Sequence, residues 1–421
     1  MTAIRFPTAL LAAACFAAAM QTAMGEGRLF DFREPPHSYF DHEPGDRWAR
    51  LKPKLIAGEV SLDQTSDMAF LKSMLAALEV PESSQMLVFS ATSLQSEKIR
   101  PRNPRALYFN EDTYVGYVPG GVLEIAAIDP EMGPMFYVFE RPTVGRVPEP
   151  ERSRRCFNCH AGSATRYVPG LIAESVLVSM AGSSLRTFRH DEQGHQLPLE
   201  DRFGGWLLTG DSGLSQHRGN LVGESQEGRV REFAVRAGEL YDPAIHPRPT
   251  SDILPQLLHE HQLGFENRLF QLRYLLRQRL HEGGGRLTAE AEKEIDAEAR
   301  AFARYSLFAD EAALPRGGLR VDADYARDFQ ARAAGGTEAE RTLRTLNLKD
   351  RLFEYRCSYM FCTESWTATP RELKERVYRH MASGLRESGT PPDLSHLPVA
   401  ERLAIRRLVK QALPDLPAWW R

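Results

Sequence analysis

The chain has 421 residues, of which 42% are hydrophobic and 26% are charged, and its formal net charge is −3. This length predicts two or three structural units, and the hydrophobic content is sufficient for a sizeable core, which excludes a wholly disordered chain. Lys and Arg are scattered along the sequence rather than gathered in a basic stripe, so we expect no nucleic acid as the main partner.

The first 25 residues have the pattern of a secretory signal peptide. Arg5 supplies a positive charge, the run that follows is mostly small and apolar, and Ala23-Met24-Gly25 offers small residues at the two positions that a signal peptidase requires. We therefore expect cleavage before Glu26, export to the periplasm and no transmembrane segment in the mature chain. A lipid anchor on Cys15 is the alternative, although the chain stays apolar after this residue, where a lipoprotein would turn polar.

Short apolar runs separated by turn residues indicate an antiparallel sheet before residue 140. An extended arm at 26–52 and a short helix at 71–78 are expected first. The expected strands are 86–90, 106–109, 114–118, 122–128 and 136–139. Further on, the runs 175–178 and 185–188 flank Ala181-Gly182-Ser183 and predict a hairpin, and a strand is expected at 206–209.

The pattern changes to helix at Ser251. Either Ser251 or Asp252 can cap a helix whose apolar residues recur at helical spacing until Gly283-Gly284-Gly285. A second helix is expected at 288–308 and a final helical block at 371–413, after a polar and less regular stretch.

The sequence thus predicts an α+β protein in three segments. The signal peptide occupies 1–25, a β-rich part that carries the chemistry extends over 26–250, and a mainly helical part over 251–421 packs on it.

The sequence Cys156-Phe157-Asn158-Cys159-His160 matches the pattern for covalent attachment of haem c. Such attachment needs two thiols that reach the two vinyl groups of one porphyrin, and an imidazole that binds the iron. We therefore expect one covalent haem c on Cys156 and Cys159, with His160 as an axial ligand. Half of a zinc site and a thioredoxin-like dithiol are the alternatives. The first would want a second ligand pair, and the second would not need His160.

The function of such a centre depends on the group opposite His160. A methionine or a second histidine closes the iron for electron transfer, whereas a vacant position admits peroxide, oxygen or another small ligand. The next methionine, Met180, lies near the tip of the expected hairpin, where a structural or exposed position is favoured.

Histidines are the stronger candidates for the distal side. His261 lies on the apolar stripe of the first long helix, where a hydrogen-bonded core histidine is the alternative. His217 lies in a polar loop, where a surface histidine or a haem-propionate contact is the alternative. His195, beside a turn, is a weaker candidate, and Met360, between two aromatic residues, is a fourth.

Two further groups of residues bear on the same centre. Arg154, Arg155 and Arg166 flank the motif and could pair with haem propionates, or could belong to a solvated loop. For Cys357 and Cys362 the sequence allows two states. They form a disulfide, which requires irregular backbone between them, or they are two buried thiols.

The chain resembles a family of exported bacterial proteins described as cytochrome c domain-containing. The resemblance covers most of the mature chain and rests on the haem motif together with 104–110, 114–121, 202–206, 217–220, 260–262 and 356–360. It implies the architecture and one haem rather than a particular reaction, and it implies that His195, His217 and His261 occupy typical histidine positions. This chain departs from the pattern at Ser212 and Glu266, where a histidine is typical, and Cys362 is atypical.

We therefore expect a periplasmic monohaem c-type cytochrome that binds haem and transfers electrons to or from a redox partner protein or a small-molecule donor or acceptor. A haem-dependent, peroxidase-like oxidoreductase with an open distal site is the first alternative, with His217 or His261 as its acid–base group. A haem-based sensor of small ligands is the second.

Overall fold

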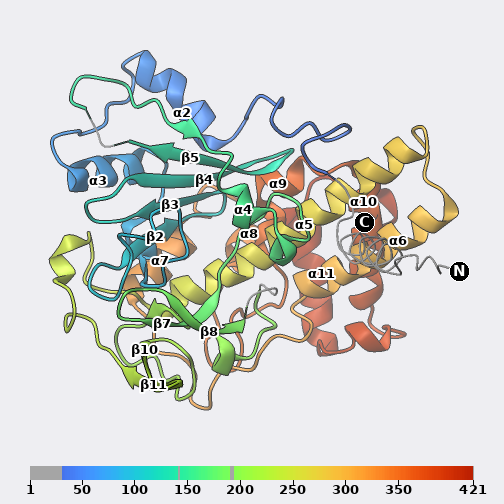
Figure 1. Cartoon of the computed structure of the whole chain (residues 1–421). Coiled ribbons are helices and arrows are strands. Elements are labelled where there is room, and N and C mark those ends of the chain that lie inside the picture. Colours follow the sequence, from blue (N-terminus) through green and yellow to red (C-terminus); the bar gives the residue numbers. More distant parts are fainter. Residues whose placement is uncertain (1–30, 141–142, 190–193, 421) are drawn as a thin grey trace, which may run out of the picture.

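The computed structural model describes residues 31–140, 143–189 and 194–420. The expected signal peptide and its cleavage site lie outside these residues. A β-rich N-terminal half and a mainly helical C-terminal part are present, so the α+β expectation is confirmed (Figure 1).

Seven strands form the larger sheet, in the order β6-β5-β4-β3-β2-β1-β9, with antiparallel neighbours throughout. Their bounds are β1 Met86–Val88, β2 Arg105–Phe109, β3 Thr113–Tyr117, β4 Leu123–Asp129, β5 Gly133–Phe139, β6 Glu151–Arg152 and β9 Trp206–Leu207. The first five match the expected strands. The two-residue strand β6, which leads into the cysteine motif, has no counterpart among the expected elements.

Four strands form a smaller sheet, in the order β11-β10-β7-β8. They are β7 Ser175–Ser179, β8 Ser184–Arg189, β10 Leu221–Gln226 and β11 Arg229–Ala234. The expected hairpin is the β7–β8 pair. The β10–β11 hairpin was not expected, because its strands are largely exposed on both faces and so lack the apolar alternation of a half-buried strand.

Ten α-helices lie in the described part of the chain. Their bounds are α2 Arg47–Ile56, α3 Asp67–Ala77, α4 Phe157–His160, α5 Ile253–Glu282, α6 Ala289–Ser306, α7 Ala323–Ala331, α8 Glu338–Leu343, α9 Glu364–Thr367, α10 Arg371–Gly384 and α11 Val399–Ala412. Helix α2 replaces the end of the expected extended arm, because the Asp46 side chain caps it by accepting from the backbone N–H groups of Trp48 and Ala49. Helices α7 and α8 lie in the stretch expected to be irregular.

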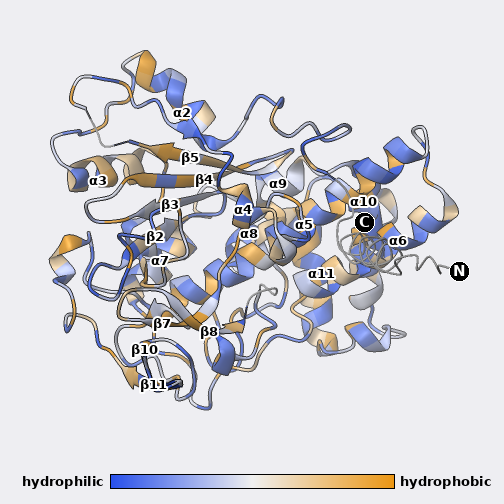
Figure 2. Ribbon diagram, viewed as in Figure 1, coloured by the Kyte–Doolittle hydropathy of each residue, from blue (hydrophilic) through white to orange (hydrophobic). Residues whose placement is uncertain are grey.

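Helix α5 is the central element of the fold. It crosses the middle of the molecule, with the larger sheet on one side, the smaller sheet below and helices α6, α10 and α11 around its C-terminal half (Figure 1). It is buried along most of its length up to Leu276. Much of it is nevertheless hydrophilic (Figure 2), because polar side chains such as His259, Glu260 and Glu266 are enclosed with the apolar ones.

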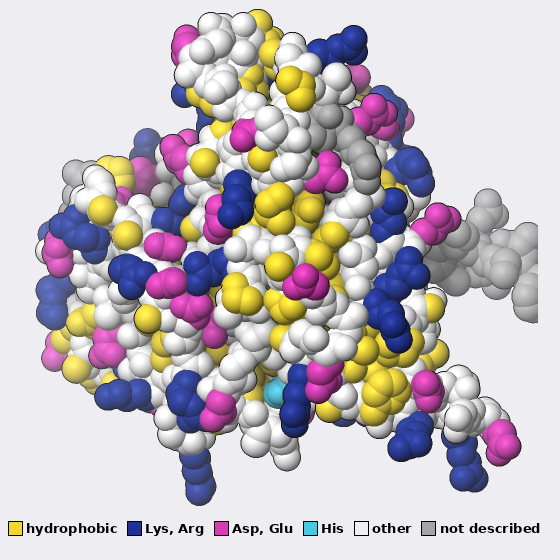
Figure 3. Space-filling view, turned by 90° about the vertical axis from the view of Figure 1, so that its left-hand side faces the viewer, with side chains coloured by type: hydrophobic (Ala, Val, Ile, Leu, Met, Phe, Trp, Pro, Cys, Tyr) yellow, Lys and Arg dark blue, Asp and Glu magenta, His cyan; other side chains and the backbone are white. Residues whose placement is uncertain are grey.

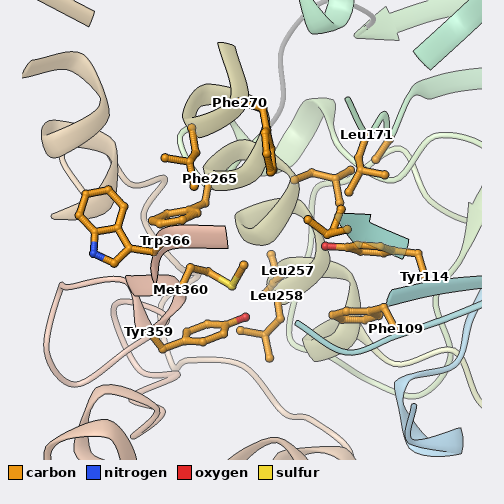
Figure 4. Close-up of a cluster of buried hydrophobic side chains, with 14 of the residues drawn as sticks. Phe109, Tyr114, Leu171, Leu257, Leu258, Phe265, Phe270, Tyr359, Met360 and Trp366 are labelled. Carbon is orange, nitrogen blue, oxygen red and sulfur yellow. The ribbon is translucent and has the colours of Figure 1, made fainter. Parts of the chain in front are cut away.

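The larger sheet has two covered faces. Trp48 of α2 packs edge-on against Phe139 at 4.7 Å between ring centroids on the outer face. On the inner face, Tyr114 donates to Gln262 Oε1 of α5 over 3.1 Å. The buried cluster in Figure 4 continues from Phe109 and Tyr114 across α5 to Met360. The sheet therefore presents one complete face to α5, and it is on this inner face that the cysteine motif lies.

The molecular surface carries mixed charge. Acidic and basic side chains alternate over the face seen in Figure 3, with hydrophobic side chains between them. Ile56 and Val144 are the most exposed large hydrophobic residues among those described, at 66% and 72%.

Candidate functional site

The cysteine motif forms one helical turn, α4, directly after β6. The His160 N–H donates to the Cys156 carbonyl over 3.0 Å, which closes this turn. Cys156 is half-buried, Cys159 is exposed, and both are free thiols. Two unlinked thiols and an imidazole therefore project from a single turn of backbone.

The His160 ring is held in a defined orientation. Its Nδ1 lies 2.9 Å from the Gly170 carbonyl oxygen and donates to it, and the Gly170 N–H donates back to the His160 carbonyl over 2.9 Å. The ring packs against Phe136 of β5 at 4.6 Å between centroids. Burial is the main cause that lowers the pKa of His160 to about 4, so the ring is neutral. With Nδ1 protonated, the lone pair lies on Nε2, which has no hydrogen-bond partner among the described residues.

The loop that returns from the motif to β7 is anchored on α5. The Asn267 side chain accepts from the Leu171 N–H over 2.8 Å and donates to the Leu171 carbonyl over 2.7 Å. A Cβ on Gly170 would stand 2.7 Å from Thr165 Cγ2 and 2.8 Å from Asn267 Oδ1. The carbonyl that orients His160 is thus held between the loop and the helix, in a space that admits only glycine.

Replacing Gly170 with Ala is expected to lower the free energy of unfolding by about 1–3 kcal/mol, because the added methyl group must displace Thr165 or Asn267. Urea unfolding measures this loss. Gly335→Ala is the matched control, since a Cβ there meets nothing within 4 Å. Equal stability of the two variants would contradict the tight packing of this loop.

Aromatic rings surround Phe157, inside the motif. Its ring centroid lies 5.1 to 5.4 Å from those of four other rings: Phe32, Tyr39, Phe40 and Phe136. Arg154 lies over Phe40 at 4.2 Å, and Arg166 forms an ion pair with Glu298 at 3.1 Å. The apolar side of α4 is therefore fixed to the sheet and to the N-terminal arm, which leaves Cys159 and Asn158 at the surface.

An ion pair on the inner face of the sheet lies close to the motif. Arg105 Nη2 is 3.1 Å from Glu124 Oε2, and both side chains are less than one-fifth exposed. The guanidinium lies over Gly116, where a Cβ would stand 2.5 Å from Nη2. The charge of Arg105 contributes to the low pKa values of both His160 and His259, behind burial.

His259 is a second histidine on this side of α5, and it was not among the candidates expected from the sequence. Its ring packs against Phe109, Tyr114 and Trp206, with centroids 5.4 to 6.1 Å away. It makes no hydrogen bond within the described part of the chain, and burial lowers its pKa to about 3. The sequence offers one sign of its position. His259 lies two residues before His261, and this spacing on a helix places the two side chains on nearly opposite faces.

The structure brings His195 and His261 together. Their Nδ1 atoms lie 2.8 Å apart and share a hydrogen bond, and His261 Nε2 is 2.9 Å from Ser358 Oγ. Both rings pack on Phe308, on the side of α5 that faces α6. Burial is the main cause that lowers the pKa of each histidine, so both are neutral. Both ring nitrogens of His261 are thus hydrogen-bonded within the protein, which fits the alternative of a core histidine. In contrast, His195 Nε2 is buried without a hydrogen-bond partner among the described residues.

His217 makes no hydrogen bond to either histidine of this pair. It is half-buried, its Nδ1 has no partner within the described ranges, and burial lowers its pKa. The neighbouring Gln216 lines a surface groove of about 420 Å³, together with Gln196, Leu214 and Ala312. Of the three histidines proposed for the distal side, His195 and His261 are therefore hydrogen-bonded to each other, and His217 lies next to a residue that lines the same groove as Gln196.

The remaining sulfur candidates lie elsewhere. Met360 is fully buried beside Tyr359 and Trp366, across α5 from Tyr114 (Figure 4). Cys357 and Cys362 are free thiols, and burial raises the pKa of both, to about 12 for Cys362.

Comparisons of the chain with protein-family models, with curated proteins and with solved structures find no match. Within the described ranges, no group of three or more His, Cys, Asp or Glu side chains is arranged to hold a metal ion. A search of the same residues finds no helix with the length and hydropathy of a membrane span.

Proposed function

We propose that this protein is a periplasmic monohaem c-type cytochrome that takes part in electron transfer with a redox partner protein or a small-molecule donor or acceptor. The observation that carries the proposal is the state of the motif. Two thiols of one helical turn are free, and the imidazole of the same turn is neutral, oriented by the Gly170 carbonyl and without a described partner at Nε2. These are the features that covalent haem attachment requires.

The residues present fit haem c in three respects. Cys156 and Cys159 offer the thioether links, His160 Nε2 offers the axial bond, and Phe136 with Phe157 supplies an apolar wall. A hydrogen bond from the ligand's Nδ1 to a backbone carbonyl is the usual way in which a protein fixes the tautomer of a metal-binding histidine and raises its basicity. The haem, when bound, supplies an iron that cycles between the ferric and ferrous states.

The chain's own residues position and shield this centre. Gly170 and Asn267 fix the His160 ring relative to α5. Cys159 lies at the surface, which favours electron exchange with a partner over a short path. Periplasmic location rests on the leader pattern of residues 1–25 and on the compartment in which haem c is attached.

Expression with a haem c maturation system tests the proposal. The wild-type protein is expected to retain haem after denaturation and to show the mass of one attached haem, whereas Cys156→Ser/Cys159→Ser is expected to lose all covalent haem. Cys362→Ser is the matched control, because it changes a cysteine outside the motif. Wild-type protein without covalent haem would overturn the proposal.

A haem-dependent oxidoreductase is the second candidate. The observation that favours it is the engagement of both His261 nitrogens, which removes one candidate for closing the iron. Carbon monoxide distinguishes the two functions. An unchanged spectrum of the ferrous protein indicates a closed, six-coordinate carrier, and a shifted Soret band indicates an open distal side, as in an oxidoreductase or a small-ligand sensor.

A further inference from the structure

The Arg105–Glu124 pair occupies a defined row on the inner face of the larger sheet. Gly116 pairs with Glu124 between β3 and β4, and Glu124 pairs with Val138 between β4 and β5. Residues directly opposite in such a ladder point to the same face, so the guanidinium that lies over Gly116 and the carboxylate of Glu124 share this face. Glycine at 116 is what leaves room for the guanidinium.

The cysteine motif lies over the same face, one strand away. Phe136 precedes Val138 by two residues on β5, so both side chains point inward, and the His160 ring packs on Phe136. Glu124 is one strand away from Phe136 and two residues further along, which puts their Cα atoms about 8 Å apart. Helix α4 lies between the ends of these strands and α5 (Figure 1).

The charges of the pair act on the motif. Burial has the largest effect on the pKa of His160 and lowers it, and the hydrogen bond to Gly170 raises it. The charge of Arg105 has the next largest effect and lowers it. At the Cys156 thiol, whose pKa is raised mainly by burial, Glu124 acts more strongly than Arg105. Arg105 Nε is also buried without an acceptor among the described residues.

We propose that the Arg105–Glu124 pair sets the reduction potential of the haem held by His160, with Arg105 favouring the ferrous state and Glu124 opposing it. The proposal rests on the proposed function. An iron that gains an electron is stabilised by a nearby positive charge, and the effect is larger inside a protein than in water because the local dielectric constant is low. An arginine keeps its charge at every accessible pH, so this contribution is constant.

Redox titration of the haem-loaded protein tests the pair. Arg105→Gln is expected to lower the midpoint potential and Glu124→Gln to raise it, each by a tenfold change in the equilibrium constant for reduction, or about 59 mV for one electron. Arg105→Lys, which keeps the charge, is expected to retain most of the wild-type potential. Arg102→Gln is the matched control, because Arg102 is exposed and lies three residues before Arg105.

The opposite signs separate an electrostatic role from a structural one. Damage to the pocket would shift both variants in the same direction and would change the absorption spectrum, and that result would overturn the inference, as would potentials within error of the control. If Arg105→Gln does not fold, the midpoint potential of Glu124→Gln alone tests the inference, and it must be higher than that of the wild type. Wild-type protein without covalent haem would overturn the proposed function and this inference together, whereas unshifted potentials in loaded protein would overturn the inference alone.

Discussion

Replacing Glu260 with Gln is expected to lower the free energy of unfolding by about 3–5 kcal/mol, because it removes a buried carboxylate charge that faces two buried guanidinium groups. Glu260 Oε1 is 2.6 Å from Arg189 Nη2, and Oε2 is 3.2 Å from Arg202 Nη1. All three side chains are less than one-tenth exposed. Burial lowers the pKa of Arg202, and the charge of Glu260 opposes this shift.

This ion triad joins parts of the chain that are distant in sequence. Arg189 ends β8, Glu260 lies on α5, and Arg202 also donates to the carbonyl oxygens of His195 and Leu197. Urea unfolding at pH 7 measures the loss. Glu149→Gln is the matched control, since Glu149 pairs with Lys52 at the surface and is 72% exposed, where an ion pair contributes at most about 1 kcal/mol. A loss no larger than that of the control would contradict a structural role for the triad.

Replacing Glu266 with Gln is expected to remove a large part of the pH dependence of stability. Glu266 is buried on α5, and neither carboxylate oxygen has a hydrogen-bond partner among the described residues. Burial raises its pKa to about 8. The Ser365 side chain and the charge of Arg273 oppose this shift, and the charge of Asp112 adds to it. The carboxyl is also close enough to Tyr114 to act on the pKa of that phenol, behind burial.

The raised pKa fixes the sign of the effect. From about pH 4.5 to about pH 8 the folded protein holds a proton on Glu266 that the unfolded chain releases, so the free energy of unfolding falls as the pH rises through this window. Between pH 5 and 8 the fall is on the order of 4 kcal/mol. The amide that Glu266→Gln introduces does not titrate, so the variant is expected to be more stable than wild type at about pH 8 and equal to it near pH 4.5.

Urea unfolding at a series of pH values measures this difference. Glu97→Gln is the control, because Glu97 is exposed and its replacement leaves the buried carboxyl in place. Parallel stability curves for the wild type and Glu266→Gln would contradict a protonated Glu266 in the folded protein.

The elements whose type is set by residues adjacent in the sequence were predicted correctly. Strands β1 to β5 and the β7–β8 hairpin follow from short apolar runs between turn residues, and α6 begins where Thr288 caps it. The sequence allows either Ser251 or Asp252 to cap the start of α5. Asp252 accepts from the Leu254 N–H, while Ser251 uses its hydroxyl to bind the Leu207 carbonyl, so it joins the helix to the sheet instead.

The missed elements have weak local patterns. Helices α7 and α8 bury few residues each and are polar over most of their surface. Strands β10 and β11 are largely exposed. Such segments are specified by the surface on which they pack, and a search for apolar periodicity does not detect them.

The candidate site divides in the same way. Spacing alone places Cys156, Cys159 and His160 in one turn, and the apolar stripe alone places His261 on a buried helix. Tertiary packing was needed to show that His261 faces His195 rather than the motif, and that His259 lies on the other side of α5.

The charged residues near the motif show why local sequence does not predict which distant residues meet. Arg105 and Glu124 belong to different strands, and the registers of β2, β3 and β4 place them together over Gly116. His160 reaches the same face only because Gly170 and Asn267 hold the returning loop on α5. Local sequence sets the type of each element through short-range sterics and hydrogen bonding. The contacts between residues far apart in the chain depend on how strands pair and how helices pack, so they follow from the folded arrangement of the whole chain.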